Sequence, residues 1–289
     1  MNRIVERAVV VTCLGHSGST LLDLILGGHP RIIGLGEVFA TMGNLARQKS
    51  EKSENVCTCG RPQAECPFWG PVAHRIRSGP CETHEERYGA VLRTFAERFG
   101  PGQIPVDISK NPSDRLRSLK TIRSVSPGTD IRVLHLVKDV RAYAISRMDR
   151  DREKGKTRRP SLVLFWRWYA QNRRIQRDLE RAGARHMVVS YDELCLEPAT
   201  AIRRLTDFLE LDPEPAMAAI SETHSHTLRG NRMRRDPEKN RAILYDYRWL
   251  YRNEWVLPAA LSPHIMRYNA RMAYGNLNRS RWENRGAGR

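Results

Sequence analysis

The sequence predicts an α/β protein with a doubly wound, mostly parallel sheet flanked by helices, in a three-layer α/β/α arrangement. Three observations predict this class. Short apolar runs alternate with segments in which apolar residues recur at helical spacing. Two of the runs, residues 8–14 and 131–137, are almost continuously apolar, as in strands buried on both faces. Strands that alternate with helices imply parallel pairing through right-handed crossovers.

The first strand, turn and helix lie within the first 30 residues. An apolar strand over 8–14 leads into a turn of small residues over 15–20, and a helix follows that ends near Gly27. Converging backbone N–H groups and a helix N-terminus favour an anion at such a turn, most often a phosphate. A plain α/β connection is the alternative interpretation, because glycines also occur in strand–turn–helix units without a ligand.

This turn is P-loop-like but differs from the loop of nucleoside triphosphatases, which needs GxxxxGK[ST]. Ser19 stands in place of the lysine, and Cys13 stands in place of the first glycine. Because that lysine reaches the β- and γ-phosphates, its absence indicates a ligand with only a 5′-phosphate-like group here. The candidate binding residues of the turn are His16, Ser17, Gly18, Ser19 and Thr20.

Residues 38–103 resemble an insertion or cap, and they contain four of the six cysteines. Part of this region is a candidate zinc site, although its spacing differs from the usual C-x-x-C knuckle. A disulfide is disfavoured in a reducing cytoplasm. We predict reduced structural thiols and no bound metal. The candidate ligands are Cys57, Cys59 and Cys66, with Cys81 or His74 as the fourth.

From residue 103 the pattern becomes βαβ. Strands are predicted over 104–109, 131–137 and 185–191, and helices follow each of them. Ser161 is predicted to cap a long helix with an aromatic stripe. Because ligands in such sheets bind at the carboxyl ends of strands, one rim should gather the residues that follow each strand. These are the turn around Ser17, then Lys110, Lys138 and Tyr191.

The last part of the chain is less regular. Residues 226–235 form a basic, glycine-containing loop, and aromatic residues from Trp249 onward indicate small helices that pack back on the sheet. Residues 276–289 are polar and rich in arginine, which predicts a disordered tail. We therefore expect one domain over 1–275.

The net charge of +17 favours a polyanionic ligand, with a solvated basic surface as the simpler interpretation. No run approaches the roughly 18 apolar residues of a membrane span. The N-terminus enters the first strand too early for a signal peptide, so a cytoplasmic protein is expected.

The turn resembles the 5′-phosphosulfate loop of the sulfotransferase family, in which a basic residue precedes Ser-Gly-Ser/Thr-Thr/Ser-Leu-Leu. His16 stands where that family usually has Arg or Lys. Residues 132–150 resemble the 3′-phosphate segment, with Lys138 and Ser146 at the phosphate-binding positions and Val140 in place of the usual proline. The resemblance covers about residues 8–235. It implies 3′-phosphoadenosine-5′-phosphosulfate (PAPS) as the sulfuryl donor, without a metal.

Further matches resemble tyrosylprotein and carbohydrate sulfotransferases, including bacterial members. Ser109-Lys110-Asn111-Pro112 resembles a turn whose lysine lies near the transferring group, and Tyr191 resembles a tyrosine near the adenine nucleotide. Glu37 follows a glycine where several members have a glutamate, which implies the general base, with His16 assisting if protonated. The loop that would cover the 3′-phosphate contains Arg229, Gly230, Asn231 and Arg232.

We therefore predict transfer of a sulfuryl group to an acceptor hydroxyl, with Glu37 as base and Lys110 stabilising the leaving phosphate. Carbohydrate, glycolipid, phenol and small-metabolite hydroxyls all remain open, anionic acceptors included. One alternative is a kinase or nucleotide-binding protein with a degenerate P-loop. The other is a nucleic-acid-binding protein that uses the basic surface, but no nucleic-acid-binding motif is visible.

Overall fold

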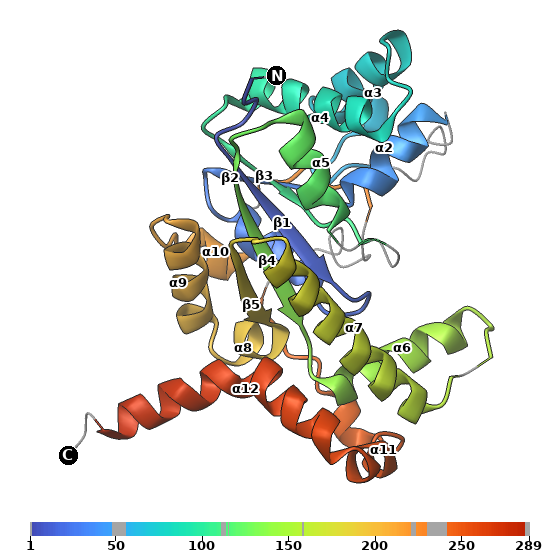
Figure 1. The fold of residues 1–289 in the computed structure, drawn as a ribbon, viewed down its shortest axis with the longest axis vertical. Coiled ribbons are helices and arrows are strands. Elements are labelled where there is room, and N and C mark those ends of the chain that lie inside the picture. The colour runs from blue at the N-terminus through green and yellow to red at the C-terminus, as the bar shows by residue number, and fades with distance from the viewer. Residues whose placement is uncertain are drawn as a thin grey trace.

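The computed structural model describes residues 2–47, 56–110, 114, 116–157, 159–220, 224–229 and 242–286. In this part of the chain a single five-stranded sheet runs through the centre, in the order β2-β3-β1-β4-β5 (Figure 1). All of its pairings are parallel. The strands are β1 (Arg7–Cys13), β2 (Ile32–Gly36), β3 (Ile104–Asp107), β4 (Asp130–Val137) and β5 (His186–Ser190).

The two central strands are the apolar runs that the sequence marks most clearly. β1 and β4 pair residue by residue, from Arg7 opposite Asp130 to Cys13 opposite Leu136. Successive side chains point to opposite faces, so Val10 and Val133 enter one core whereas Val9 and Leu134 enter the other. Burial on both faces explains why neither strand shows a polar alternation.

Four described helices between β2 and β4 in the chain share one apolar core with one face of the sheet, and α7 (Ser161–Arg181) adds Ile175 and Leu179 to that core. α4 begins with a capping box, in which Thr83 and Glu86 exchange side-chain and backbone hydrogen bonds. Three of the four lie between β2 and β3 in the chain, within the region that the sequence marks as an insertion or cap. The helices are α2 (Val38–Ala46), α3 (Trp69–Ser78), α4 (His84–Phe99) and α5 (Arg117–Val125).

The opposite face is covered by a second set of helices, which confirms the three-layer prediction. α9 has proline at its first position, where the missing N–H costs no hydrogen bond. The helices of this layer are α1 (Ser19–Gly27), α8 (Tyr191–Leu196), α9 (Pro198–Leu209) and α10 (Ala216–Ala219).

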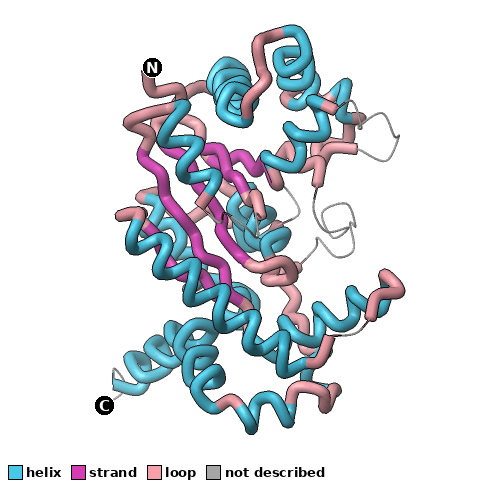
Figure 2. The backbone as a smooth tube through the Cα atoms, turned by 45° about the vertical axis from the view of Figure 1, so that its right-hand side comes forward, coloured by secondary structure: helices cyan, strands magenta, loops and turns pink. Residues whose placement is uncertain are grey.

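A third apolar core lies where the long helices meet. Figures 1 and 2 show α6, α11 and α12 at the end of the molecule opposite α3 and α4. No helix in the described ranges combines the length and apolarity needed to cross a membrane. The remaining elements are α6 (Val140–Glu153), α7 (Ser161–Arg181), α11 (Val256–Leu261) and α12 (Pro263–Gly286), with 3₁₀ turns η1 (Gln63–Glu65) and η3 (Arg248–Tyr251).

Two local predictions are wrong. Ser161 is the first residue of α7 and not its cap, because its hydroxyl donates to the Glu254 carbonyl of another segment. The disordered tail expected over 276–289 is helical through Gly286, since α12 continues without a break from a buried stretch that includes Tyr268, Met272 and Leu277. Residues 287–289 lie outside the described ranges.

Candidate active site

The residues that follow each strand lie at one edge of the sheet, because all five strands run in the same direction. The turn around Ser17 follows β1, Glu37 follows β2 and Lys110 comes three residues after β3. Lys138 follows β4, and Tyr191 follows β5. The structure therefore gathers the strand-end residues on the rim that the sequence analysis predicts.

The turn after β1 has an unusual backbone. His16 and Gly18 both have positive φ, at +75° and +88°, and the Gly18 carbonyl accepts the Leu22 N–H at the start of α1. A Cβ on Gly18 would lie 2.2 Å from the Tyr191 ring, so only glycine lets that ring close over the turn. Ser17 and Ser19 are buried beside it.

His16 lies among cations. Its Nδ1 is 3.3 Å from the Ser146 hydroxyl, and its Nε2 is 3.4 Å from an Arg147 guanidinium nitrogen. Burial is the main cause that lowers the pKa of His16 to about 4, and the positive charges of Arg147, Lys110, Arg150 and Lys138 contribute to the same shift. The imidazole is therefore neutral at pH 7 in the ligand-free protein. The positive charges that disfavour protonation of His16 would also attract an anion to this place.

Glu37 and Lys110 form an ion pair just beyond the carboxyl ends of the neighbouring strands β2 and β3. Lys110 Nζ donates to Glu37 Oε1 at 3.2 Å, and both side chains are partly buried. Burial alone would lower the pKa of Lys110, but Cys13 and Glu37 more than offset it and the pKa lies above its ordinary value. Glu37 also precedes α2 and its carbonyl accepts the Thr41 N–H, so the helix start holds its backbone in place.

The buried carboxylate of Asp107 fixes the backbone next to the Glu37–Lys110 pair. Asp107, at the end of β3, accepts hydrogen bonds from the Ser109 N–H at 2.7 Å and from the Tyr88 hydroxyl at 2.8 Å. Burial raises its pKa. The Ser109 hydroxyl oxygen in turn accepts the Phe39 N–H at 3.0 Å, which joins the strand end to α2. These contacts orient the segments that carry Lys110 and Glu37.

Lys138 is nearly fully buried, and it is paired. Its Nζ donates to Asp246 Oδ2 at 3.0 Å and lies 4.4 Å from the centre of the Tyr191 ring. Burial would raise the pKa of Asp246, but Arg248 and Lys138 hold it well below its ordinary value. The same region stacks Tyr245 on Tyr191, with ring centres 6.1 Å apart. In the ligand-free protein the Asp246 carboxylate thus pairs with Lys138, the residue that the sequence resemblance assigns to phosphate binding.

A buried polar network holds the Lys138 segment. Asp139 accepts the Arg141 N–H at 2.7 Å as the cap of α6, and its own N–H donates to Asp192 at 2.9 Å. Burial and the Asp139 charge raise the pKa of Asp192 to about 6. Asn269 of α12 donates to Asp139 at 2.7 Å and accepts the Val140 N–H at 2.8 Å. The C-terminal helix therefore positions the strand end that bears Lys138.

The late basic loop is described only up to Arg229. Residues 224–229 run beside β2, where Ser225 bridges Gly34 and the His226 N–H donates to the Gly34 carbonyl at 2.7 Å. Arg229 is exposed and donates to the Ala40 carbonyl at 3.4 Å. Gly230, Asn231 and Arg232 lie outside the described residues, as do Asn111 and Pro112.

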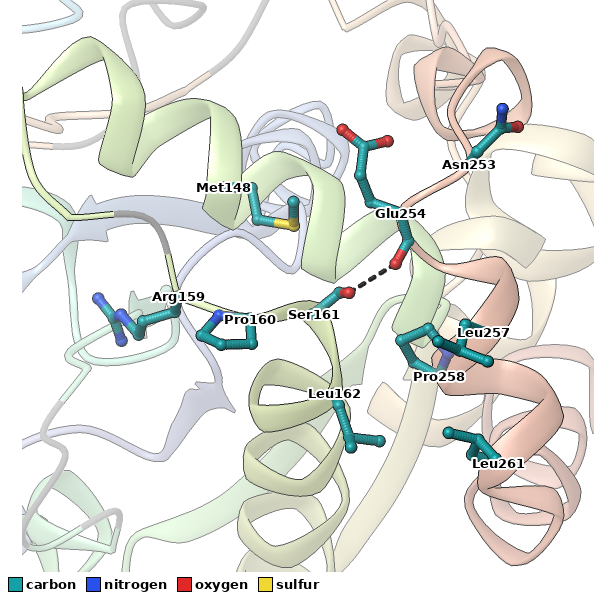
Figure 3. A pocket seen from close by; sticks show the side chains of 10 residues that line it. All are labelled: Met148, Arg159, Pro160, Ser161, Leu162, Asn253, Glu254, Leu257, Pro258 and Leu261. Carbon is teal, nitrogen blue, oxygen red and sulfur yellow. Dashed lines mark hydrogen bonds between the residues drawn. The ribbon is translucent and has the colours of Figure 1, made fainter.

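A cavity of about 490 Å³ lies between α6, α7 and α11 (Figure 3). Most of its lining is apolar, including Met148, Leu162 and Leu257. Met148 and Ser146 are two positions apart on α6 and therefore point in nearly opposite directions. Because Ser146 faces His16, this cavity is separate from the rim site.

Several further residues lie at the rim without having been predicted from the sequence. Arg147 adjoins the predicted Ser146, and the helical pattern of α6 could have suggested it. Asp246 pairs with Lys138 and Tyr245 stacks on Tyr191, each from more than 50 positions away in sequence, and no local signal identifies them.

Comparisons with known proteins agree with this architecture. Residues 8–215 match the model of the sulfotransferase family. A sulfotransferase domain from the curacin biosynthetic pathway is 18% identical, with a TM-score of 0.54 over 90% of this chain and 98% of that one. One from the olefin synthase of Synechococcus PCC 7002 is 19% identical, with a TM-score of 0.52 over 90% and 95%. Among curated proteins no significant match is found. With the matched model spanning most of its length, the chain belongs to the sulfotransferase family and is a sulfotransferase enzyme.

Proposed function

We propose that the sulfuryl donor is PAPS and that the rim site transfers its sulfuryl group to an acceptor hydroxyl. The observation that carries the proposal is the convergence of an anion-binding turn, a carboxylate–lysine pair and several cations at one edge of the sheet. This combination suits a donor with two phosphate groups and a reaction that moves negative charge.

The donor's 5′ side belongs at the turn after β1. Backbone N–H groups of residues 17–20 lie at the start of α1, where the helix dipole favours an anion. Its 3′ side belongs near Lys138 and Ser146, with the Tyr191 ring beside the adenine. The loop of Arg229, Gly230, Asn231 and Arg232 would cover the 3′-phosphate.

The reaction is an in-line displacement at sulfur. The acceptor oxygen forms a new bond to sulfur while the bond from sulfur to the bridging 5′-phosphate oxygen breaks. Glu37 takes the acceptor proton, and Lys110 stabilises the charge that develops on the leaving phosphate. The products are a sulfate ester and adenosine 3′,5′-bisphosphate. The 3.2 Å contact between Lys110 and Glu37 holds the base and the lysine on the same side of the site.

His16 contributes here as a neutral hydrogen-bonding group, because its pKa of about 4 in the ligand-free protein leaves it uncharged at pH 7. Bound phosphate would offset the surrounding cations and raise that pKa. Protonated His16 could then assist Lys110 at the leaving group, in place of the Arg or Lys usual for the family.

Donor-product binding tests the proposal. Adenosine 3′,5′-bisphosphate should raise the Tm without magnesium, by mass action on the folded state, and AMP should raise it much less. A degenerate P-loop kinase would instead require magnesium and a nucleoside triphosphate. Equal shifts with the two nucleotides would contradict the 3′-phosphate assignment.

Two substitutions break the same ion pair with opposite expected results. Lys138→Ala removes a charge-assisted contact to the 3′-phosphate and should weaken bisphosphate binding by about 1.5–3 kcal/mol. Asp246→Asn frees Lys138 from its carboxylate partner and should strengthen binding. If calorimetry finds both variants weaker, loss of the ion pair disturbs the structure and Lys138 does not meet the phosphate.

The acceptor is assigned only as a hydroxyl compound. Carbohydrates, glycolipids, phenols and small metabolites, anionic ones included, all present suitable oxygens. Incubation with labelled PAPS and a panel of these classes identifies the acceptor through the labelled sulfate ester.

A further inference from the structure

Three cysteines and a histidine outside the active site come together in the structure. The Sγ atoms of Cys57, Cys59 and Cys66 and a ring nitrogen of His226 all lie within 4.8 Å of one another. Cys59 and Cys66 are 3.8 Å apart at sulfur, and His226 Nδ1 is 3.3 Å from the Cys66 sulfur and 3.8 Å from that of Cys57. Four ligand-type atoms therefore surround one point.

These distances suit a shared metal ion. Tetrahedral zinc with Zn–S near 2.3 Å and Zn–N near 2.0–2.1 Å separates two sulfurs by about 3.8 Å, and a sulfur from a nitrogen by about 3.6 Å. A disulfide would need its sulfurs about 2.05 Å apart. The observed contacts lie close to the edges of a coordination tetrahedron and far from a covalent bond.

The backbone around the first two cysteines forms a tight turn that aims both sulfurs at this point. Val56 and Pro62 form an antiparallel bridge, the Cys57 N–H donates to the Arg61 carbonyl at 2.8 Å, and the Gly60 N–H donates to the Cys57 carbonyl at 2.9 Å. Gly60 has a φ of +84°, which glycine adopts without strain. This turn brings two ligands into position in only three residues.

Aromatic residues contact the other two candidate ligands, Cys66 and His226. The Trp69 backbone N–H lies 3.4 Å from the Cys66 sulfur, and its indole N–H donates to the His226 carbonyl. The rings of Phe68 and Phe99 pack on the His226 ring, with centres 5.9 and 5.5 Å away. N–H donors toward sulfur and packed rings around the imidazole are features that stabilise a thiolate–metal site.

We propose that Cys57, Cys59, Cys66 and His226 bind one structural Zn²⁺ ion. Three thiolates and one imidazole are a donor set typical of structural zinc, and four protein ligands leave no position for a substrate. The proposal replaces the prediction of no metal. It also corrects the predicted fourth ligand, because neither Cys81 nor His74 belongs to the cluster within the described residues.

The ion would join two segments that are distant in sequence. Thr58 already links the cysteine turn to the segment of residues 224–229, which contains His226. The Thr58 hydroxyl donates to the Ser225 carbonyl at 2.7 Å and accepts the Thr227 N–H at 2.9 Å. That segment pairs with β2 and approaches Gly36, where a Cβ would lie 2.5 Å from Thr227. Zinc would thus hold the strand beside Glu37 without touching the reacting atoms, and it does not depend on the identity of the donor.

Elemental analysis of the full chain, purified without added metal or chelator, tests the proposal. Wild type should contain about one zinc per chain. Cys59→Ser should lose it, and because Cys59 is at the surface this change leaves the core unaltered. His226→Asn should lose it too. His74→Asn and Cys81→Ser are matched controls for the excluded ligands, and both should keep the wild-type zinc content.

Cobalt gives a second measurement that separates coordination from folding. Chelator-treated wild type and both controls should bind one Co²⁺ and show the visible bands and sulfur-to-metal charge transfer of a tetrahedral thiolate site. His226→Cys keeps four ligands and should bind Co²⁺ with a more intense charge-transfer band. Wild type without zinc and without this cobalt spectrum, or zinc kept by Cys59→Ser and His226→Asn, would overturn the assignment.

Discussion

In the proposed mechanism the carboxylate of Glu37 accepts the proton of the acceptor hydroxyl. Glu37→Gln keeps the size and the hydrogen bond to Lys110 but cannot take up the proton. We expect turnover to fall about 10²–10⁴-fold, the usual range for a positioned base, with bisphosphate affinity unchanged. Steady-state kinetics and calorimetry measure the two quantities.

Glu85→Gln, at an exposed position in the first turn of α4, is the control and should leave turnover unchanged. A loss smaller than tenfold in Glu37→Gln with intact binding would transfer the role of base to another residue. His16 is then the next candidate, because it is neutral at pH 7 in the ligand-free protein.

The low pKa of His16 also makes stability depend on pH. Its pKa is about 4 in the folded protein and 6.5 ordinarily, so the unfolded chain binds more protons between these values. The free energy of unfolding should therefore fall as pH drops from 6.5 toward 4. His16→Asn tolerates the positive φ of this position and should show a shallower fall in urea titrations. Equal slopes for the two proteins would mean that His16 has the same pKa in the folded and the unfolded protein.

At the scale of elements, the turn between β1 and α1 depends on one glycine. Gly18→Ala combines a positive φ of +88° with a Cβ that would lie 2.2 Å from the Tyr191 ring. The conformation alone costs about 1–2 kcal/mol, and Tyr191 must also move. We expect a lower Tm and weaker bisphosphate binding.

Gly15 is the matched control in the same turn, because a Cβ there meets nothing within 4 Å. Gly15→Ala should bind the bisphosphate like wild type. If Gly18→Ala retained both stability and binding, the contact between the turn and Tyr191 would not matter for the donor site.

Whole-molecule organisation depends on α12, which lies beyond the residues matched by the family model. Asn269 is buried and links this helix to the start of α6 through Asp139 and the Val140 N–H. Asn269→Ala leaves both groups without that partner and should destabilise the protein by about 1–3 kcal/mol. Chemical denaturation measures the loss.

Arg267→Ala is the control on the same helix, because Arg267 is exposed. It should change stability by less than about 0.5 kcal/mol. Asn269→Ala should also weaken bisphosphate binding, since the network that it disturbs holds the segment of Lys138. Unchanged stability in Asn269→Ala would show that α12 does not support this end of the sheet.

The order of elements and the rim of the sheet could be predicted because their causes are local. β-branched apolar runs form buried strands, and the capping and periodicity that produce α4 lie within one segment. Parallel strands then bring their carboxyl ends to one edge, so positions such as Lys110 and Lys138 follow from topology alone.

Only the tertiary structure decides which distant groups meet. His226 joins Cys57 across 169 positions, and Asp246 joins Lys138 across 108, with no pattern near either partner that indicates the other. The sequence does not indicate that α12 continues past residue 275 for a related reason. Its arginine-rich end is typical of a disordered segment, and the helix continues there from a packed stretch that precedes it. Local chemistry determines the conformation of a segment, whereas pairing across the chain depends on how all intervening layers pack.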